Sequence, residues 1–124
     1  MAIAFVSSAT TVDSSGTATR TITKPTGLVA GNVCVLVCSG NLSGPGTVTS
    51  APSGFTFLRR VLNGSNSYLD IYWKVLTSSE PTWSITYSGS SKGCYHAVQY
   101  SGVDTTTPFD AESGAADTAS GTSH

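Results

Sequence analysis

Two aspartates flank a run of three threonines near the end of the sequence, in the stretch YSGVDTTTPFDAES. Asp104 and Asp110 supply carboxylates, which bind calcium in some loops and act as acids or bases in catalysis. A calcium loop needs more oxygen ligands than two separated aspartates offer. The spacing favours a corner, in which Asp104 accepts hydrogen bonds from the amides that follow it and Pro108 stiffens the exit. We therefore predict that Tyr100 ends a strand and that Phe109 pins the next segment to the core.

Three cysteines and one histidine form a second candidate set. Cys34 and Cys38 lie four residues apart on one predicted strand, or about 13 Å, which exceeds the Cα separation of about 7 Å that a disulfide allows. Cys94 and His96 share a face of another predicted strand, so the four side chains superficially resemble a zinc site. Structural zinc sites usually place two cysteines close together on a turn. We therefore predict no metal, and we interpret the cysteines as small core residues.

Catalytic motifs are weakly represented. His96 is the only histidine before His124, no Gly-x-Ser-x-Gly motif is present, and no acid lies near His96 in the sequence. The glycine-rich stretches lack the lysine of a phosphate-binding loop. Few acids are present in strand interiors, which gives weak support for a glycosidase pair. The sequence thus predicts neither an enzyme nor a bound cofactor.

One predicted strand carries the most specific binding hypothesis. Tyr68, Asp70, Tyr72 and Lys74 alternate with four apolar residues. We interpret the apolar set, which includes Trp73, as core and the other four side chains as outward-facing. Two tyrosines at this spacing can stack on sugar rings while their charged neighbours bind hydroxyls, so the four are candidate contacts for a glycan or a partner. The alternatives are cross-strand packing or cover by a second sheet or a neighbouring subunit.

Strands must position all of these groups. Ser and Thr together make up 38 of the 124 residues, a composition that disfavours helices. Several segments alternate with a period of two residues, and none keeps a helical period for three turns. We predict strands at residues 3–8, 17–24, 32–39, 55–62, 67–76, 82–88 and 93–100. Their regular spacing predicts an all-β antiparallel β-sandwich of jelly-roll or immunoglobulin-like type, because a parallel sheet would need crossover helices.

The alternation also assigns faces to other strands. Residues 32–39 are apolar on both faces, which predicts a central, doubly covered strand. Residues 17–23 place four threonines on one face, as expected for an exposed sheet surface or an edge. In residues 82–88, Trp83, Ile85 and Tyr87 are predicted to face the core.

Composition limits the partners and the organisation. The net charge is −1 and charged residues make up 10%, so nucleic acid is not an expected partner. No apolar run is long enough for membrane insertion, and the N-terminus lacks the features of a signal peptide. We predict one β-sandwich domain at residues 1–110. Residues 111–124 contain no large apolar side chain and are predicted to form a polar tail or docking arm.

Four phrases occur in a characteristic order: KPTGLVAGNVCVLVCSG, APSGFTFLRR, SYLDIYWKVLTSSEPTWSITYSG and YHAVQYSGVDTTTPFDA. This order resembles a β-sandwich domain family of bacteriophage virion proteins, including tail-fibre, minor tail and capsid-accessory or decoration proteins, and of some bacterial surface proteins. The resemblance covers about residues 24–111. Domains of that family usually continue for several strands beyond the position of His124, and cysteines here replace Leu, Ala or Val. We therefore expect a partner chain or sequence beyond residue 124 to complete the sandwich, because an exposed edge invites pairing.

The resemblance implies a function and supplies no catalytic residues. It implies a non-enzymatic virion structural protein, made in the host cytoplasm and displayed on the particle surface as a capsid decoration or a tail-fibre module. The expected partners are other virion proteins, further copies of the chain, and host-surface glycans. The alternative is a carbohydrate-binding module of a surface or secreted protein, which would use Tyr68 and Tyr72.

Overall fold

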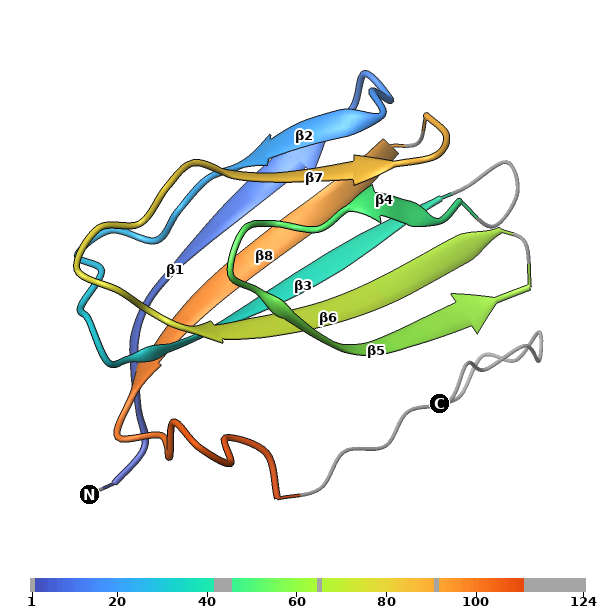
Figure 1. Cartoon of the computed structure of the whole chain (residues 1–124). Coiled ribbons are helices and arrows are strands. Elements are labelled where there is room, and N and C mark those ends of the chain that lie inside the picture. Colours follow the sequence, from blue (N-terminus) through green and yellow to red (C-terminus); the bar gives the residue numbers. More distant parts are fainter. Residues whose placement is uncertain (1, 42–45, 65, 91, 111–124) are drawn as a thin grey trace, which may run out of the picture.

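The structure, a computed structural model, describes residues 2–41, 46–64, 66–90 and 92–110 (Figure 1). These residues form eight strands and no helix, which confirms the predicted all-β class. Each of the seven predicted segments overlaps one of the strands. The strands are β1 (Ala4–Asp13), β2 (Thr19–Ile22), β3 (Val33–Asn41), β4 (Val48–Ser50), β5 (Thr56–Asn63), β6 (Ser67–Val75), β7 (Trp83–Tyr87) and β8 (Lys92–Ser101). The sequence did not predict β4, because three residues are too short to show a period of two.

Two antiparallel sheets pack face to face as a β-sandwich (Figure 1). One sheet has five strands in the order β1-β8-β3-β6-β5, and the other has three in the order β2-β7-β4. The central position of β3, between β8 and β6, confirms the prediction for residues 32–39. β2 lies at an edge with its threonines exposed, as predicted. The predicted tail, residues 111–124, lies outside the described residues.

The hydrophobic core lies between the two sheets. Strand β3 supplies Cys34, Leu36 and Cys38, all with 0% exposure, from the face that meets the three-stranded sheet. Strand β7 of the three-stranded sheet contributes Trp83, Ile85 and Tyr87, the three side chains that were predicted to face inward. Burial of apolar surface at about 25 cal/mol per Å² is the main favourable term that holds the sheets together.

A pair of glycines makes room for two tyrosine rings in this core. Gly40 and Gly93 are direct partners on neighbouring strands. A Cβ atom on Gly40 would lie 2.7 Å from the Tyr68 ring, and one on Gly93 would lie 2.7 Å from the Tyr95 hydroxyl. The two tyrosine hydroxyls meet over this gap at 3.4 Å. The missing side chains therefore leave room for both tyrosine side chains.

The prediction for the faces of β6 is wrong. Tyr68, Asp70, Tyr72 and Lys74 face the three-stranded sheet and are 3%, 0%, 2% and 6% exposed. The apolar set, including Trp73, lies on the opposite face of the five-stranded sheet and is only half-buried. The alternative that a second sheet covers the tyrosines is the arrangement that the structure has.

We predict that Gly40→Ala lowers the free energy of unfolding by about 1–3 kcal/mol, because the new methyl group overpacks the site against the Tyr68 ring and a backbone oxygen. Urea denaturation measures the change. Gly89→Ala is the matched control, since a Cβ atom there meets open space, and it should change stability by less than about 0.5 kcal/mol. Equal effects of the two substitutions would contradict this account of the core.

Candidate functional site

An ion pair explains why Asp70 can lie in the interior. The Asp70 carboxylate is 0% exposed and accepts two hydrogen bonds of 2.6 Å from the Arg60 guanidinium. The Tyr87 hydroxyl also donates to Asp70, at 3.4 Å. Arg60 donates further to the carbonyl of Gly46, which precedes β4. This network therefore joins β5 and β6 of one sheet to β7 and the β4 segment of the other.

A second pair holds Lys74 in the interior. The Lys74 ammonium lies 2.6 Å from Glu80, and the two side chains are 6% and 2% exposed. Glu80 also accepts hydrogen bonds from the indole of Trp83 and from the backbone amide and hydroxyl of Thr77. Burial by itself would raise the pKa of Glu80, but the hydrogen bonds from Lys74, Thr77 and Trp83 outweigh it and lower the pKa to about 2. The carboxylate is therefore charged at neutral pH.

The sequence contained a signal for this arrangement that periodicity does not detect. Both faces of β6 carry large apolar or aromatic side chains, so alternation alone cannot select the buried one. Arg60 lies ten residues before Asp70 and Glu80 lies six residues after Lys74. Each buried charge thus has an opposite charge close in sequence, which is the condition for burying it.

The inverted register leaves an apolar surface on the five-stranded sheet, which we call the outer face. Residues that are paired directly across strands share a face of the sheet. The outer face is built from three neighbouring rows: Val98, Val35 and Trp73; His96, Val37 and Ile71; Cys94, Ser39 and Leu69. Most of these side chains are half-buried, and His96 is exposed. The three-stranded sheet packs on the opposite side and leaves this face uncovered.

The segment after β8 covers one end of the outer face. Phe109 packs edge-on against Trp73, with ring centroids 6.1 Å apart. Phe109 and Pro108 also line a crevice of about 170 Å³ with Val35 and Tyr100. Phe109 therefore pins the segment to the sheet as predicted, but on the outer face and not in the core between the sheets.

The predicted corner at Asp104 is confirmed. The Asp104 carboxylate accepts hydrogen bonds from the amides of Thr106 and Thr107, at 2.8 and 3.3 Å. These bonds lower the pKa of Asp104 below its usual value. Gly102 has φ of +72°, and a Cβ atom there would meet the backbone of Ala2, so the turn requires glycine. Among the described residues, no group of three or more His, Cys, Asp or Glu side chains is placed to hold a metal.

The cysteines and the histidine do not converge. Cys34 and Cys38 lie in the core, and burial raises the pKa of both thiols to about 12, which leaves them unreactive at neutral pH. Cys94 and His96 share a face, as predicted, but it is the outer face. His96 is exposed and its Nδ1 lies 2.7 Å from the hydroxyl of Thr10. The arrangement offers no shared site for a metal or a nucleophile.

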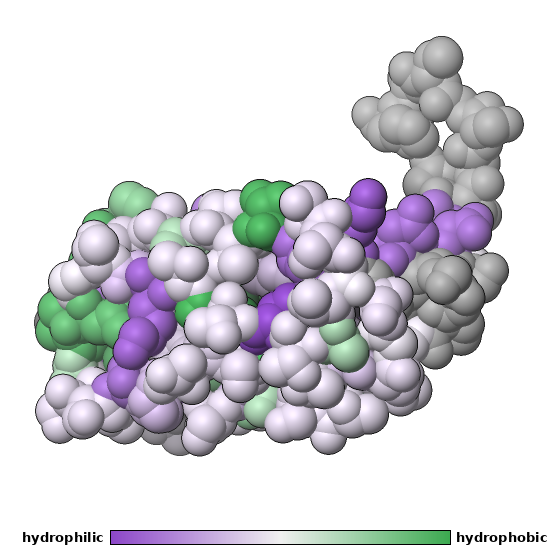
Figure 2. Space-filling view, turned by 90° about the horizontal axis from the view of Figure 1, so that it is seen from above, coloured by the Kyte–Doolittle hydropathy of each residue, from purple (hydrophilic) through white to green (hydrophobic). Residues whose placement is uncertain are grey.

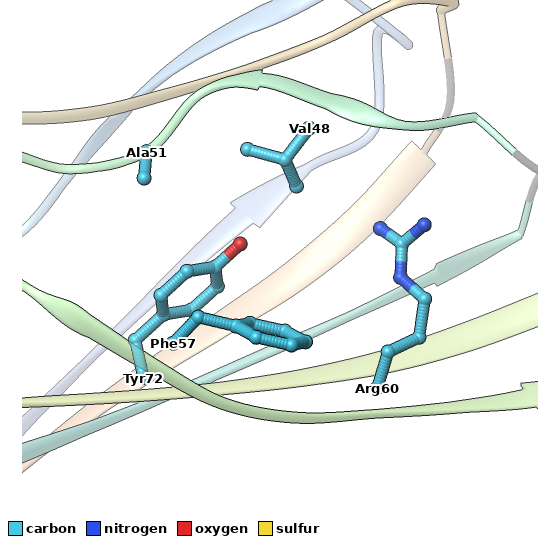
Figure 3. A pocket seen from close by; sticks show the side chains of 5 residues that line it. All are labelled: Val48, Ala51, Phe57, Arg60 and Tyr72. Carbon is cyan, nitrogen blue, oxygen red and sulfur yellow. The ribbon is translucent and has the colours of Figure 1, made fainter.

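A pocket of about 360 Å³ opens at the edge where β4 faces β5 and β6. Its lining residues are Val48, Ala51, Phe57, Arg60 and Tyr72. Figure 3 shows Val48 and Ala51 on one side, with the other three side chains opposite and the Tyr72 hydroxyl pointing toward Val48. Tyr72 is the one candidate glycan residue that lines this pocket. Binding of a glycan by the chain stays a prediction.

The rest of the visible surface has little chemical contrast. Figure 2 shows a face of mostly pale, near-neutral residues with a few isolated hydrophobic and hydrophilic patches, as the high content of Ser and Thr predicts.

Comparisons with protein families, with characterised proteins and with solved structures found no match. The described residues include no helix with the length and apolarity needed to cross a membrane.

We predict that Glu80→Gln lowers the free energy of unfolding at pH 7 by about 3 kcal/mol, because Lys74 loses the counter-charge that compensates its burial. The pKa of Glu80 is lowered from 4.5 to about 2 on folding, so its contribution is complete above pH 4.5 and is lost as the pH falls toward 2. The difference between wild type and variant should therefore shrink over this interval. Urea denaturation at several pH values measures it.

Asp110→Asn is the control for this experiment, because it removes an exposed acid. It should change stability by less than about 0.5 kcal/mol at every pH. If the difference in the free energy of unfolding between wild type and Glu80→Gln stays constant from pH 5 to about pH 2, the result would argue against the role of Glu80.

Proposed function

We propose that this chain is a non-enzymatic structural protein of a bacteriophage particle, displayed on the particle surface as a capsid decoration or a tail-fibre module. The resemblance of its ordered phrases to virion β-sandwich domains supports the setting. The apolar outer face, which the three-stranded sheet does not cover, is the observation that supports the proposed mode of action, contact between subunits. The hydroxyl-rich, weakly charged surface seen in Figure 2 suits a protein that is displayed and packed in many copies.

The outer face is large enough to be an interaction surface. Three strands about 4.8 Å apart and three rows about 6.8 Å apart give a flat area of roughly 300 Å². Continuous apolar patches of a few hundred Å² on soluble proteins mark interaction sites more often than the average surface does. The Phe109 segment covers one end, so the free part centres on Val37, Ile71 and Leu69.

A second copy of the chain is the partner that we propose for this face. None of the nine side chains in the three rows is Asp, Glu, Lys or Arg, whereas Arg59 lies beside Ile71 on the edge strand β5 and Lys92 lies at the end of β8. Two copies can therefore meet centre to centre without bringing buried charges together. Packing of this kind between two sheet faces is the same geometry that joins the sheets within one sandwich.

Electron cryo-microscopy and mass spectrometry of purified phage particles test the setting. The chain should be present in many copies as surface density on the capsid or in a few copies on the tail. Particles in which the chain is neither detected by mass spectrometry nor visible as density would contradict the proposal.

We predict that Ile71→Lys weakens self-association of the isolated chain at least about tenfold, because the contact would bury an unpaired ammonium group. Sedimentation equilibrium measures the dissociation constant. Thr21→Lys is the matched control, since it adds the same charge to the exposed surface of the three-stranded sheet and should leave the constant within about twofold. If Ile71→Lys and Thr21→Lys have equal dissociation constants for self-association, the contact between copies does not lie on the outer face.

A further inference from the structure

The two sheets differ in width, and the narrower one leaves part of the wider one uncovered. Strand β4 is an edge of the three-stranded sheet, and β5 is an edge of the five-stranded sheet. Among the described residues, no strand pairs with the second edge of β4. The pocket of about 360 Å³ lies between these two edges and is lined from both. The three-stranded sheet therefore lacks a strand at the place where the pocket is open.

Two side chains of β5 confirm that the gap is on the core side of the sheet. Phe57 pairs with Tyr72 and Leu62 pairs with Tyr68, so both point to the same side as the buried tyrosines. Phe57 is nevertheless 53% exposed and Leu62 is 40% exposed. Large apolar side chains on the interior face of a sandwich are normally covered by the opposite sheet. These two would be covered if one more strand lay beside β4.

The chemistry of the pocket indicates what that strand must present. Phe57 and Tyr72 pack edge to face, with ring centroids 5.4 Å apart, and form an apolar wall opposite Val48. The Arg60 side chain is 20% exposed, whereas its partner Asp70 is 0% exposed beneath it. An approaching segment thus meets the cation and not the carboxylate. The pocket is complementary to an apolar side chain that is followed, on the same face of the strand, by an acid.

We infer that the pocket is a strand-addition site for an extended segment of a partner protein. The segment pairs its backbone with the free edge of β4, inserts an apolar side chain of about leucine size between Val48 and Phe57, and places a carboxylate beside Arg60. Backbone pairing gives affinity in this mode of recognition, and pockets for alternate side chains give selectivity. Residues 111–124 contain no large apolar side chain, so they do not supply the inserted group.

The probe for this site is the peptide acetyl-Thr-Leu-Thr-Val-Thr-Glu-amide, in which Leu, Val and Glu share one face of an extended strand. It is titrated into the full, isotope-labelled chain, and the amide resonances are followed by NMR. We expect the largest shifts at Val48, Thr49 and Ser50 and at Phe57. A peptide with Ser in place of Leu and Val should bind at least about tenfold more weakly, and one with Gln in place of Glu about threefold more weakly.

Two protein variants distinguish binding in the pocket from nonspecific binding of the peptide. Ala51→Trp fills the pocket and should weaken binding at least about tenfold, whereas Ala30→Trp adds the same ring to an exposed loop away from the pocket and should leave it within about twofold. The inference is overturned if the amide shifts fall on the outer face, if they fall on β5 without β4, or if none is seen at millimolar peptide. It is also overturned if the Ser peptide binds as tightly as the original peptide, or if Ala51→Trp binds the original peptide as tightly as the wild type does. None of these results depends on whether the chain belongs to a phage particle.

Discussion

The register of β6 depends on two ion pairs that place its charged residues between the sheets. Asp70 and Lys74 are each held by an opposite charge and by further hydrogen bonds, so neither is an uncompensated charge in the interior. Breaking such a pair costs several kcal/mol. A shift of one residue along the strand would turn both tyrosines outward and would move Asp70 and Lys74 away from Arg60 and Glu80. The register of β6 therefore determines which of its side chains enter the core and which form the outer face.

The outer face follows directly from that register. When Tyr68 and Tyr72 turn inward, the alternating residues, including Ile71 and Trp73, must turn outward. Among the described residues, the segment after β8 covers one end of the resulting apolar surface, through the contact between Phe109 and Trp73. Strand β6 thus keeps its charged side chains between the sheets and its aliphatic side chains on the outer face.

The Arg60 network also determines the shape of the open edge. Arg60 reaches from β5 to the carbonyl of Gly46, and so fixes the start of β4 above the five-stranded sheet. The three-stranded sheet ends there, with β4 as its edge strand. The pocket is therefore a consequence of how the two sheets are joined, and its walls come from residues that the network already holds in place.

Local rules in the sequence determined the fold class, seven of the eight strands, the central place of β3 and the turn at Asp104. These features depend on residue alternation, turn-forming residues and hydrogen bonds within a few positions, all of which are visible along the chain. The tertiary structure decided which face of β6 is buried, because both faces have large side chains and the opposite charges of Arg60 and Glu80 lie on other segments of the chain. It also decided the existence of β4 and of the pocket beside it. A three-residue strand and an unequal number of strands in two sheets arise from packing between distant segments, and periodicity does not record such packing.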